Sequence, residues 1–168
     1  MIHSLTICDL DDIDQIELAE LIAHIVHKGQ FRRDGQTPYV EHPEAVCDLL
    51  YDLVYDYGFT EAEIDEACAV ALLHDVLEDA TCVDFTYKTL LALGVSSNIV
   101  VAVVLLTKTK EESYQRYLEQ MCSNKLALIV KIADITHNLS DSPKALTVPR
   151  YQKALVFLKE KLSALQLA

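Results

Sequence analysis

The sequence predicts an all-α protein, and three observations support this fold class. Only four glycines and four prolines occur in 168 residues, which disfavours a turn-rich β fold. Apolar residues near the N-terminus recur at roughly helical spacing, at Ile13, Ile16, Leu21 and Ile25. Two segments with strand propensity, 99–104 and 129–130, have lengths and connections that fit helices better. A chain of this length is expected to form a single domain over 1–168.

The first two helices are predicted from apolar spacing and from proline and glycine signals. The segment 11–26 begins with acidic residues, which favour a helix N-terminus, and a polar loop follows over 28–38. Pro43 suits the first turn of a second helix, which is expected to run to about Tyr57. Gly58 is expected to end it.

A third helix is predicted from a capping signal. Thr60 followed by Glu63 has the spacing of a capping box. The apolar run that follows is expected to continue as one helix through His74 to about Asp79.

The second half of the chain is expected to contain further, mostly short helices. Gly94 is expected to close the first of them, and Ser96 or Ser97 to cap the next. Pro149 precedes the last. The predicted helical segments are 82–93, 98–106, 110–121, 124–139 and about 149–165.

The net charge of −12 limits the classes of partner. A phosphate backbone or an anionic membrane surface attracts Lys and Arg, so we expect no nucleic-acid polymer and no membrane as partner. Lys28, Arg32 and Arg33 nevertheless cluster in the first polar loop. A local basic cluster on an acidic protein suits a small anionic ligand, although a solvated positive patch is the alternative.

Cysteine usage and the absence of export signals predict a cytoplasmic protein. The five cysteines are scattered and form no Cys-x-x-Cys pair, so they are expected to be reduced and mostly buried. The apolar run 99–106 is too short to cross a bilayer. The first residues lack the basic start and long apolar stretch of a signal peptide.

The segment 71–79 interrupts an apolar run with four ionisable residues. On a continuous helix, His74 and Glu78 share one face, as do Asp75 and Asp79. An imidazole beside carboxylates is suited to holding a metal ion. A helix end that meets solvent explains this segment about equally well when it is taken alone.

Two other polar residues stand out and complete a set of metal ligands. His42 directly precedes Pro43, and Asp134 lies in an otherwise apolar helix, where an unpaired carboxylate is costly. Taken alone, Asp134 is explained better by an ion pair with Lys131 or Lys125. Two imidazoles and two carboxylates suit Mn²⁺, Fe²⁺ or Zn²⁺ with positions open for water. The predicted ligands are His42, His74, Asp75 and Asp134.

Three motifs in this order resemble those of the HD-domain metal-dependent phosphohydrolases. They are Gly-Gln-Phe-Arg-Arg-Asp-Gly-Gln-Thr-Pro-Tyr-Val-Glu-His-Pro at 29–43, Ala-Leu-Leu-His-Asp-Val-Leu-Glu-Asp at 71–79 and Lys-Ile-Ala-Asp-Ile-Thr-His-Asn at 131–138. The similarity is closest to the hydrolase domain of RelA/SpoT proteins and to small stand-alone alarmone hydrolases. It implies an HD-domain helical bundle with its core motifs within 20–140.

The resemblance also implies an activity. Such enzymes remove the 3′-pyrophosphate from guanosine tetra- or pentaphosphate, with Mn²⁺ the most expected ion. This chain departs from the family pattern at two places. After Asn138 it has Leu139-Ser140-Asp141 where the relatives usually have Met-Arg-Thr, and after Glu78-Asp79 it has Ala80 where they usually have Thr. The alternatives are hydrolysis of another nucleotide or phosphate ester, and a non-catalytic regulator that binds nucleotide or metal. The sequence gives no oligomeric state.

Roles for the remaining residues follow from residue type and from the resemblance. Glu78 and Asp79 are expected to orient or deprotonate the attacking water. Arg32 and Arg33 are expected to meet phosphate or stack on a base, because guanidinium does both. The resemblance implies that Asn138 contacts substrate.

Several residues near the motifs are expected to be structural. His137 is predicted to support a ligand or to pack, rather than to bind metal, and Tyr39 and Phe31 are expected in the core. His24 and His27 are expected to lie on the surface or to pack. The sequence does not distinguish which of three tyrosines line the pocket, namely Tyr114, Tyr117 and Tyr151.

Overall fold

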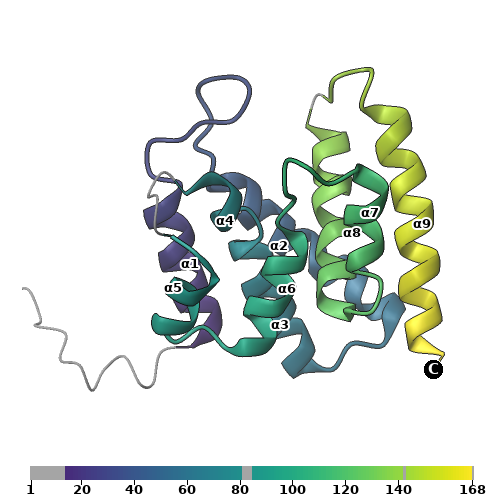
Figure 1. Cartoon of the computed structure of the whole chain (residues 1–168), viewed down its shortest axis with the longest axis horizontal. Helices are drawn as coiled ribbons and strands as arrows, with labels where there is room; N and C mark the ends of the chain where they lie inside the picture. The colour runs from purple at the N-terminus through teal and green to yellow at the C-terminus, as the bar shows by residue number, and fades with distance from the viewer. Residues whose placement is uncertain (1–13, 81–84, 142, 168) are drawn as a thin grey trace, which may run out of the picture.

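The computed structural model describes residues 14–80, 85–141 and 143–167 (Figure 1). Within these residues the regular structure is helical, apart from an isolated antiparallel bridge between Phe31 and Pro38. The predicted all-α class is confirmed. The elements are α1 (Gln15–Val26), α2 (Glu41–Val54), the 3₁₀ turn η2 (Tyr55–Tyr57), α3 (Glu61–Leu73), α4 (Val76–Asp79), α5 (Tyr87–Ala92), α6 (Ser97–Leu106), α7 (Tyr114–Gln120), α8 (Lys125–Ser140) and α9 (Val148–Gln166).

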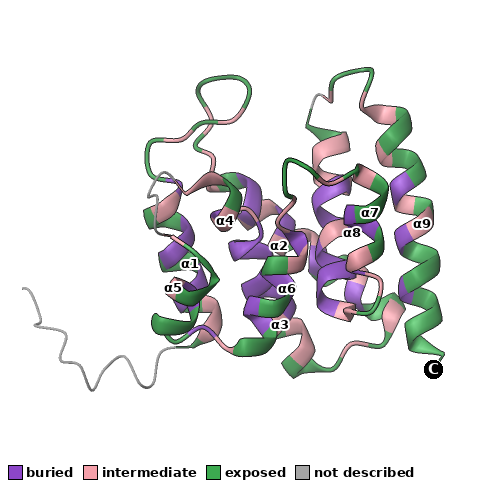
Figure 2. Cartoon of the chain, viewed as in Figure 1, coloured by how far each residue is buried: buried purple, intermediate pink, exposed green. Residues whose placement is uncertain are grey.

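Two helices form the centre of the bundle. α3 packs against α1, α2, α6 and α8, while α8 packs against α2, α3, α6 and α9. The α3 residues 67–73 are all buried, and so are the α8 residues 126–130 and 132–135. A helix that is apolar on all sides is stable only when other helices surround it. Figure 2 accordingly shows buried segments on the inner helices and exposed segments along α9.

Several predicted helix ends are confirmed. Thr60 and Glu63 form the capping box that opens α3, because each side chain accepts the backbone N–H of the other. The side chains of Ser96 and Asn124 cap α6 and α8 by accepting a backbone N–H three residues further on. Gly58 follows η2 in the left-handed region with φ 59°, where glycine is favoured.

The predicted helix through His74 to Asp79 is wrong in one respect, since the chain turns after Leu73. His74 and Asp75 form this turn, and α4 begins only at Val76. The i,i+4 pairing expected from a continuous helix therefore does not apply. Successive residues of a helix point about 100° apart. The turn instead aims the His74 and Asp75 side chains toward the same space.

Two helices of the second half are shorter than predicted. Ser113 caps α7 by accepting the N–H of Arg116, so the first residues of the predicted 110–121 helix belong to the preceding loop. The predicted 82–93 helix begins after its cap, Thr86. Residues 82–84 of that prediction lie outside the described residues.

The first two helices also differ slightly from their predicted extents. The side chain of Asp14 accepts the N–H of Ile16 and caps α1, and the predicted residues 11–13 lie outside the described residues. The second helix starts at Glu41, two residues before Pro43, and its last turn tightens into η2. His42 is consequently part of the helix and buried in its first turn.

One end of the bundle gathers the segments that carry the polar motifs. The loop 27–40, the short helix α4, the loop 107–113 and the C-terminal end of α8 all lie at the upper end in Figure 1. The C-terminal end of α9 lies at the opposite end. Segments far apart in the sequence therefore meet at one site.

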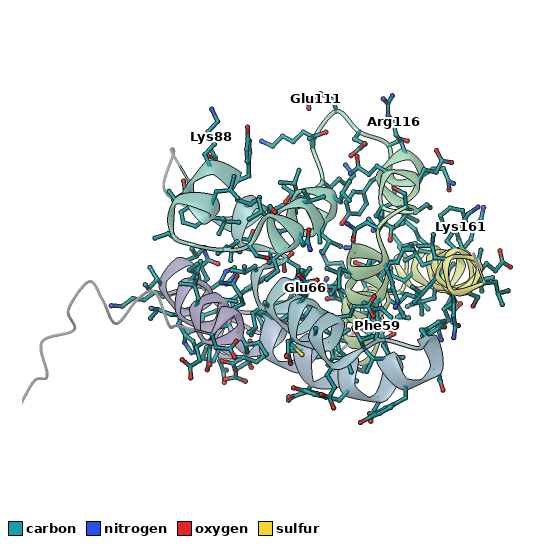
Figure 3. All side chains as sticks on the ribbon, turned by 90° about the horizontal axis from the view of Figure 1, so that it is seen from below. Phe59, Glu66, Lys88, Glu111, Arg116 and Lys161 are labelled. Atoms are coloured by element: carbon teal, nitrogen blue, oxygen red, sulfur yellow. The ribbon has the colours of Figure 1, made fainter. Side chains whose placement is uncertain are left out.

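Charged side chains project from the outer surface of the bundle. Figure 3 shows Glu111, Arg116 and Lys161 projecting outward from the loop before α7, from α7 and from α9. No described helix is both long enough and apolar enough to cross a membrane.

Packing around α8 predicts a large penalty for opening a cavity there. Leu128 is fully buried, and we expect Leu128→Ala to reduce the free energy of unfolding by about 2–5 kcal/mol. Val156 on α9 is 61% exposed, so Val156→Ala should change it by less than about 0.5 kcal/mol. Urea unfolding followed by circular dichroism measures both. Equal losses in the two variants would contradict this account of the core.

Candidate functional site

Four side chains from three parts of the bundle converge at its upper end. His42 comes from α2, Asp134 from α8, and His74 and Asp75 from the turn between α3 and α4. His42 Nε2 lies 3.2 Å from Asp134 Oδ1 and 3.8 Å from Asp75 Oδ2. His74 Nε2 lies 3.2 Å from Asp75 Oδ2 and 3.8 Å from Asp134 Oδ1. The four predicted ligands are therefore brought together.

The His74 ring is oriented by the backbone. Its Nδ1 lies 2.7 Å from the carbonyl oxygen of Ala71, which only accepts hydrogen bonds, so Nδ1 carries the proton. The opposite nitrogen, Nε2, is buried and has no hydrogen-bond partner among the described residues. Burial disfavours the imidazolium form, but the carboxylates of Asp75 and Asp134 outweigh burial and raise the pKa of His74 to about 9. A cation at Nε2 would give this nitrogen a partner and would balance the charge of the two carboxylates.

The His42 ring is held by a second histidine. His42 Nδ1, in the first turn of α2, lies 2.7 Å from Nδ1 of His137, in the last turn of α8. Burial lowers the pKa of His42 and thereby favours the neutral ring. His137 supports a candidate ligand, as expected, and does not itself join the donor cluster.

Asp134 is buried but fully partnered. Its Oδ2 accepts a hydrogen bond of 2.8 Å from Lys131 Nζ, and its Oδ1, which faces the two histidines, also accepts from Asn138 Nδ2. Burial alone would raise the pKa of Asp134, but the Lys131 charge and the histidines hold it well below the ordinary value. The ion pair with Lys131 thus exists beside the candidate metal cluster and does not replace it.

Tyr39 contributes to the site, whereas the sequence predicted a core residue. Its hydroxyl donates a hydrogen bond of 2.7 Å to Asp75 Oδ2, and its ring packs edge-on against His42. The predicted core position of Phe31 is wrong, since its side chain is 55% exposed. Phe31 lies in the loop between α1 and α2, where it forms an isolated bridge with Pro38. The sequence signal for the role of Tyr39 in the site was its position three residues before the predicted ligand His42.

Glu78 and Asp79 lie on α4 next to the cluster. Glu78 Oε1 accepts the backbone N–H of Lys108, a contact that sequence spacing did not predict. Burial, and then the negative charge of Asp75, raise the pKa values of both Glu78 and Asp79. The backbone of Asp79 is held in turn, because its carbonyl oxygen accepts a 2.9 Å hydrogen bond from Gln30 Nε2.

A cavity of about 650 Å³ opens beside His42. Residues of the 27–40 loop, the start of α2 and the C-terminal end of α8 surround it. Arg32 and Arg33 both line it, whereas Lys28 does not. Its lining residues are Arg32, Arg33, Asp34, Thr37, Glu41, His42, Ala45, His137, Ser140 and Asp141. The predicted anion-binding arginines therefore adjoin the candidate metal cluster.

Arg32 is already engaged in this cavity. Its Nη2 donates to Asp141 Oδ2 at 2.6 Å and to Asn138 Oδ1 at 3.4 Å, and its guanidinium lies 5.6 Å from the Tyr39 ring centroid. Asn138 bridges Arg32 to Asp134, which links the cavity to the metal cluster. Asp141 was noted in the sequence only as a departure from the family motif. Arg33 is exposed and has no ion pair among the described residues.

The three candidate tyrosines differ in position. Tyr117 is buried, and its hydroxyl donates a 2.6 Å hydrogen bond to the Leu106 carbonyl oxygen, so its role is in the core. Tyr114 lines a separate cavity of about 520 Å³ between α7 and α9, together with Arg150. The Arg150 guanidinium lies 4.7 Å from the Tyr114 ring centroid and 5.5 Å from that of Tyr151.

The donor cluster fits a divalent metal ion. Ligand atoms of His42, His74 and Asp134 all lie within 4.8 Å of one another, and these three residues are buried. Imidazole and carboxylate donors without thiolates are typical of Mn²⁺, Fe²⁺ and Zn²⁺ sites with open positions. The other group of potential donors in the described residues, Glu20, His24 and Glu44, is at the surface and largely exposed.

The sequence matches the model of a known protein family. Residues 39–139 match the HD domain. The chain belongs to the HD domain family. HD domains bind divalent metals, and the buried cluster of His42, His74 and Asp134 lies within the matched residues. The resemblance drawn from the three sequence motifs is confirmed.

Individual relatives point in the same direction. The chain is 31% identical over 137 residues to the bifunctional (p)ppGpp synthase/hydrolase SpoT of Escherichia coli K12, covering 77% of this chain but 18% of that protein. It is 35% identical over 131 residues to the mouse guanosine-3′,5′-bis(diphosphate) 3′-pyrophosphohydrolase MESH1, covering 75% of this chain and 68% of MESH1. The chain thus spans about a fifth of the length of SpoT and two thirds of MESH1.

A solved structure shares the fold. It is described as a metazoan ortholog of SpoT that hydrolyzes ppGpp. The TM-score is 0.63 at 24% identity, and the match covers 89% of this chain and 86% of the other. The HD-type helical bundle predicted from the motifs is confirmed.

The pKa of His74 predicts how metal affinity depends on pH. In the metal-free protein His74 is protonated below about pH 9, and a metal ion binds only the neutral ring. Binding must therefore displace about one proton, and the association constant for Mn²⁺ should rise about tenfold per pH unit between roughly pH 6 and 8. Isothermal titration calorimetry in buffers of different ionisation enthalpy measures the released proton. A pH-independent affinity would contradict this electrostatic description of the cluster.

Proposed function

We propose that this chain is a metal-dependent phosphohydrolase that removes the 3′-pyrophosphate from guanosine tetra- or pentaphosphate. The observation that carries the proposal is the donor cluster beside a cavity lined by Arg32 and Arg33. A divalent-cation site next to two arginine side chains suits a phosphorylated small molecule. The names of SpoT and MESH1 support guanosine bis(diphosphate) as this molecule.

We assign the metal ion to His42, His74, Asp75 and Asp134 and expect Mn²⁺, with Fe²⁺ or Zn²⁺ as alternatives. Such an ion, when bound, lowers the pKa of water and polarises a phosphoryl oxygen. The protein atoms that would hold it are His42 Nε2, His74 Nε2 and one oxygen of each carboxylate, which lie close together. Tyr39, Asn138 and the backbone of Ala71 keep these groups in position through their hydrogen bonds.

Glu78 is proposed as the group that takes the proton from the attacking water, and Asp79 as the group that orients this water. A general base is most effective when its pKa lies near the working pH. Burial and the nearby Asp75 charge raise the pKa values of both carboxyl groups toward that range. The N–H of Lys108 occupies one oxygen of Glu78 and leaves the other for the water.

Arg32, Arg33 and Asn138 are proposed to bind the nucleotide. Asp141 and Asn138 fix the plane of the Arg32 guanidinium, which suits stacking on a base. Arg33 lines the same cavity without an ion pair among the described residues, which suits contact with phosphate. Asp141 places an additional negative charge in this cavity, so hydrolysis of another nucleotide or phosphate ester is the second candidate function.

A nucleotide panel tests the substrate. Purified protein with Mn²⁺ should release pyrophosphate from guanosine tetraphosphate and pentaphosphate, and chelation of the metal should abolish the release. GTP, ATP and a simple phosphate ester serve as comparison substrates, with pyrophosphate and phosphate quantified separately. Release from the comparison substrates alone would replace the leading proposal by the second candidate. Mn²⁺ binding with no release from any substrate would favour a non-catalytic regulator.

Substitution of Glu78 tests the proton acceptor. Glu78→Gln keeps the shape of the side chain but removes its basicity, so kcat should fall by about 10²-fold or more. Mn²⁺ affinity should remain unchanged, because Glu78 is not among the proposed ligands. Glu111→Gln, on the exposed loop before α7, is the matched control and should leave kcat unchanged. A Glu78→Gln variant with normal kcat would remove Glu78 from the reaction.

A further inference from the structure

His137 takes no part in the proposed reaction, yet it touches a proposed metal ligand. It lies on α8, three residues after Asp134, and its ring centroid is 4.8 Å from that of His42. The two Nδ1 atoms are 2.7 Å apart, which is the distance of a hydrogen bond. One of these two nitrogens must therefore carry the proton that the other accepts.

The environment of His42 determines which ring is the donor. Its other nitrogen, Nε2, faces Asp134 Oδ1 at 3.2 Å and Asp75 Oδ2 at 3.8 Å, so Nε2 is the atom available to a metal ion. A neutral imidazole that binds metal through Nε2 carries its proton on Nδ1. In the metal-bound protein His42 Nδ1–H consequently donates to His137 Nδ1. His137 must then be neutral and protonated at Nε2.

This constraint has a consequence in the neighbouring cavity. His137 lines the 650 Å³ cavity together with Arg32, Ser140 and Asp141. Its Nδ1 is occupied by His42, and its Nε2 has no hydrogen-bond partner among the described residues. The Nε2–H is therefore available to an acceptor atom of a molecule in the cavity. A single ring thus connects the metal cluster to the substrate cavity.

We propose that His137 is a positioning residue that fixes His42 as an Nε2 metal donor and, in doing so, presents its own Nε2–H to a substrate oxygen. The proposal rests on the metal site of the proposed function and extends it. Residues that hydrogen-bond a metal-binding histidine fix its tautomer and orientation, and their loss typically weakens metal affinity about 10–100-fold.

Two substitutions separate the two parts of this role. In His137→Asn the side-chain Oδ1 takes the place of Nδ1 and still accepts from His42, but the Nε2–H is lost. In His137→Leu both the acceptor for His42 and the Nε2–H are lost. Mn²⁺ alone, titrated calorimetrically, should bind about 10–100-fold more weakly to His137→Leu and nearly normally to His137→Asn. Val156→Ala, on the exposed face of α9 and outside both groups of potential metal donors, is the control and should not change the affinity.

Nucleotide kinetics test the second part of the role, which is the contact of the His137 Nε2–H with a substrate oxygen. With Mn²⁺ saturating, His137→Asn should raise KM for the nucleotide about fivefold, the usual effect of one lost hydrogen bond, with a smaller effect on kcat. An unchanged KM would overturn the proposed contact with substrate. An unchanged Mn²⁺ affinity in His137→Leu would overturn the positioning role, while leaving the proposed hydrolase function intact.

The wild-type protein provides a test that does not depend on the folding of variants. Histidine ¹⁵N chemical shifts, recorded with diamagnetic Zn²⁺ bound, report which ring nitrogen is protonated. His137 should be neutral with its proton on Nε2, and His42 should carry its proton on Nδ1. A His137 ring protonated at Nδ1 would overturn the inference. A wild-type chain that binds neither Mn²⁺ nor Zn²⁺ would overturn the metal-dependent function itself, and this inference with it.

Discussion

The buried carboxylate of Asp134 constrains the rest of the site. It is only 5% exposed and lies on a helix whose neighbouring residues are almost all apolar and buried. An unpaired charge in such a position would cost several kcal/mol, roughly the stability margin of a domain. The fold avoids this cost because each of the two carboxylate oxygens has its own partners. Lys131 neutralises Oδ2, and Oδ1 faces His42 and His74.

This arrangement couples the positions of three helices. α2, α3 and α8 all pack against one another, and each contributes at its upper end to the partners of one carboxylate. Carboxylates nevertheless outnumber cations locally, since Asp75, Glu78 and Asp79 lie close by. Burial is the largest cause of the raised pKa values of Glu78 and Asp79, and the charge of Asp75 adds electrostatic repulsion. A divalent cation relieves it, so metal binding and the stability of the folded state are expected to be linked.

The sequence predicted those features that depend on local chemistry. The capping box of Thr60 and Glu63, the cap of Asn124 and the turn at Gly58 follow from short-range hydrogen bonds and backbone preferences. The four residues of the proposed ligand set could also be singled out, because a histidine or an aspartate in an apolar helix requires a partner. The convergence of these four side chains depends on tertiary packing, so it is seen only in the structure.

Other features depended on contacts between distant segments. The residues 71–79 have no helix-breaking glycine or proline, so local propensity favoured a continuous helix where the chain in fact turns. Tyr39 was expected in the core, but its hydroxyl donates to Asp75, a partner that lies 36 residues further along the chain. The partners Arg32 and Asp141 lie 109 residues apart, and no spacing rule relates them.

The proposed nucleotide substrate is a polyanion, and its binding is compatible with a net charge of −12 because exposed charges act over short distances. At physiological ionic strength, exposed charges more than about 8 Å apart are largely screened. The nucleotide in the cavity would therefore respond mainly to Arg32, Arg33, Asp141 and the metal ion. Asp141 neutralises much of Arg32, so the metal and Arg33 would supply most of the attraction. The metal ion would then serve substrate binding as well as the reaction, and its loss should weaken nucleotide affinity before any step of chemistry.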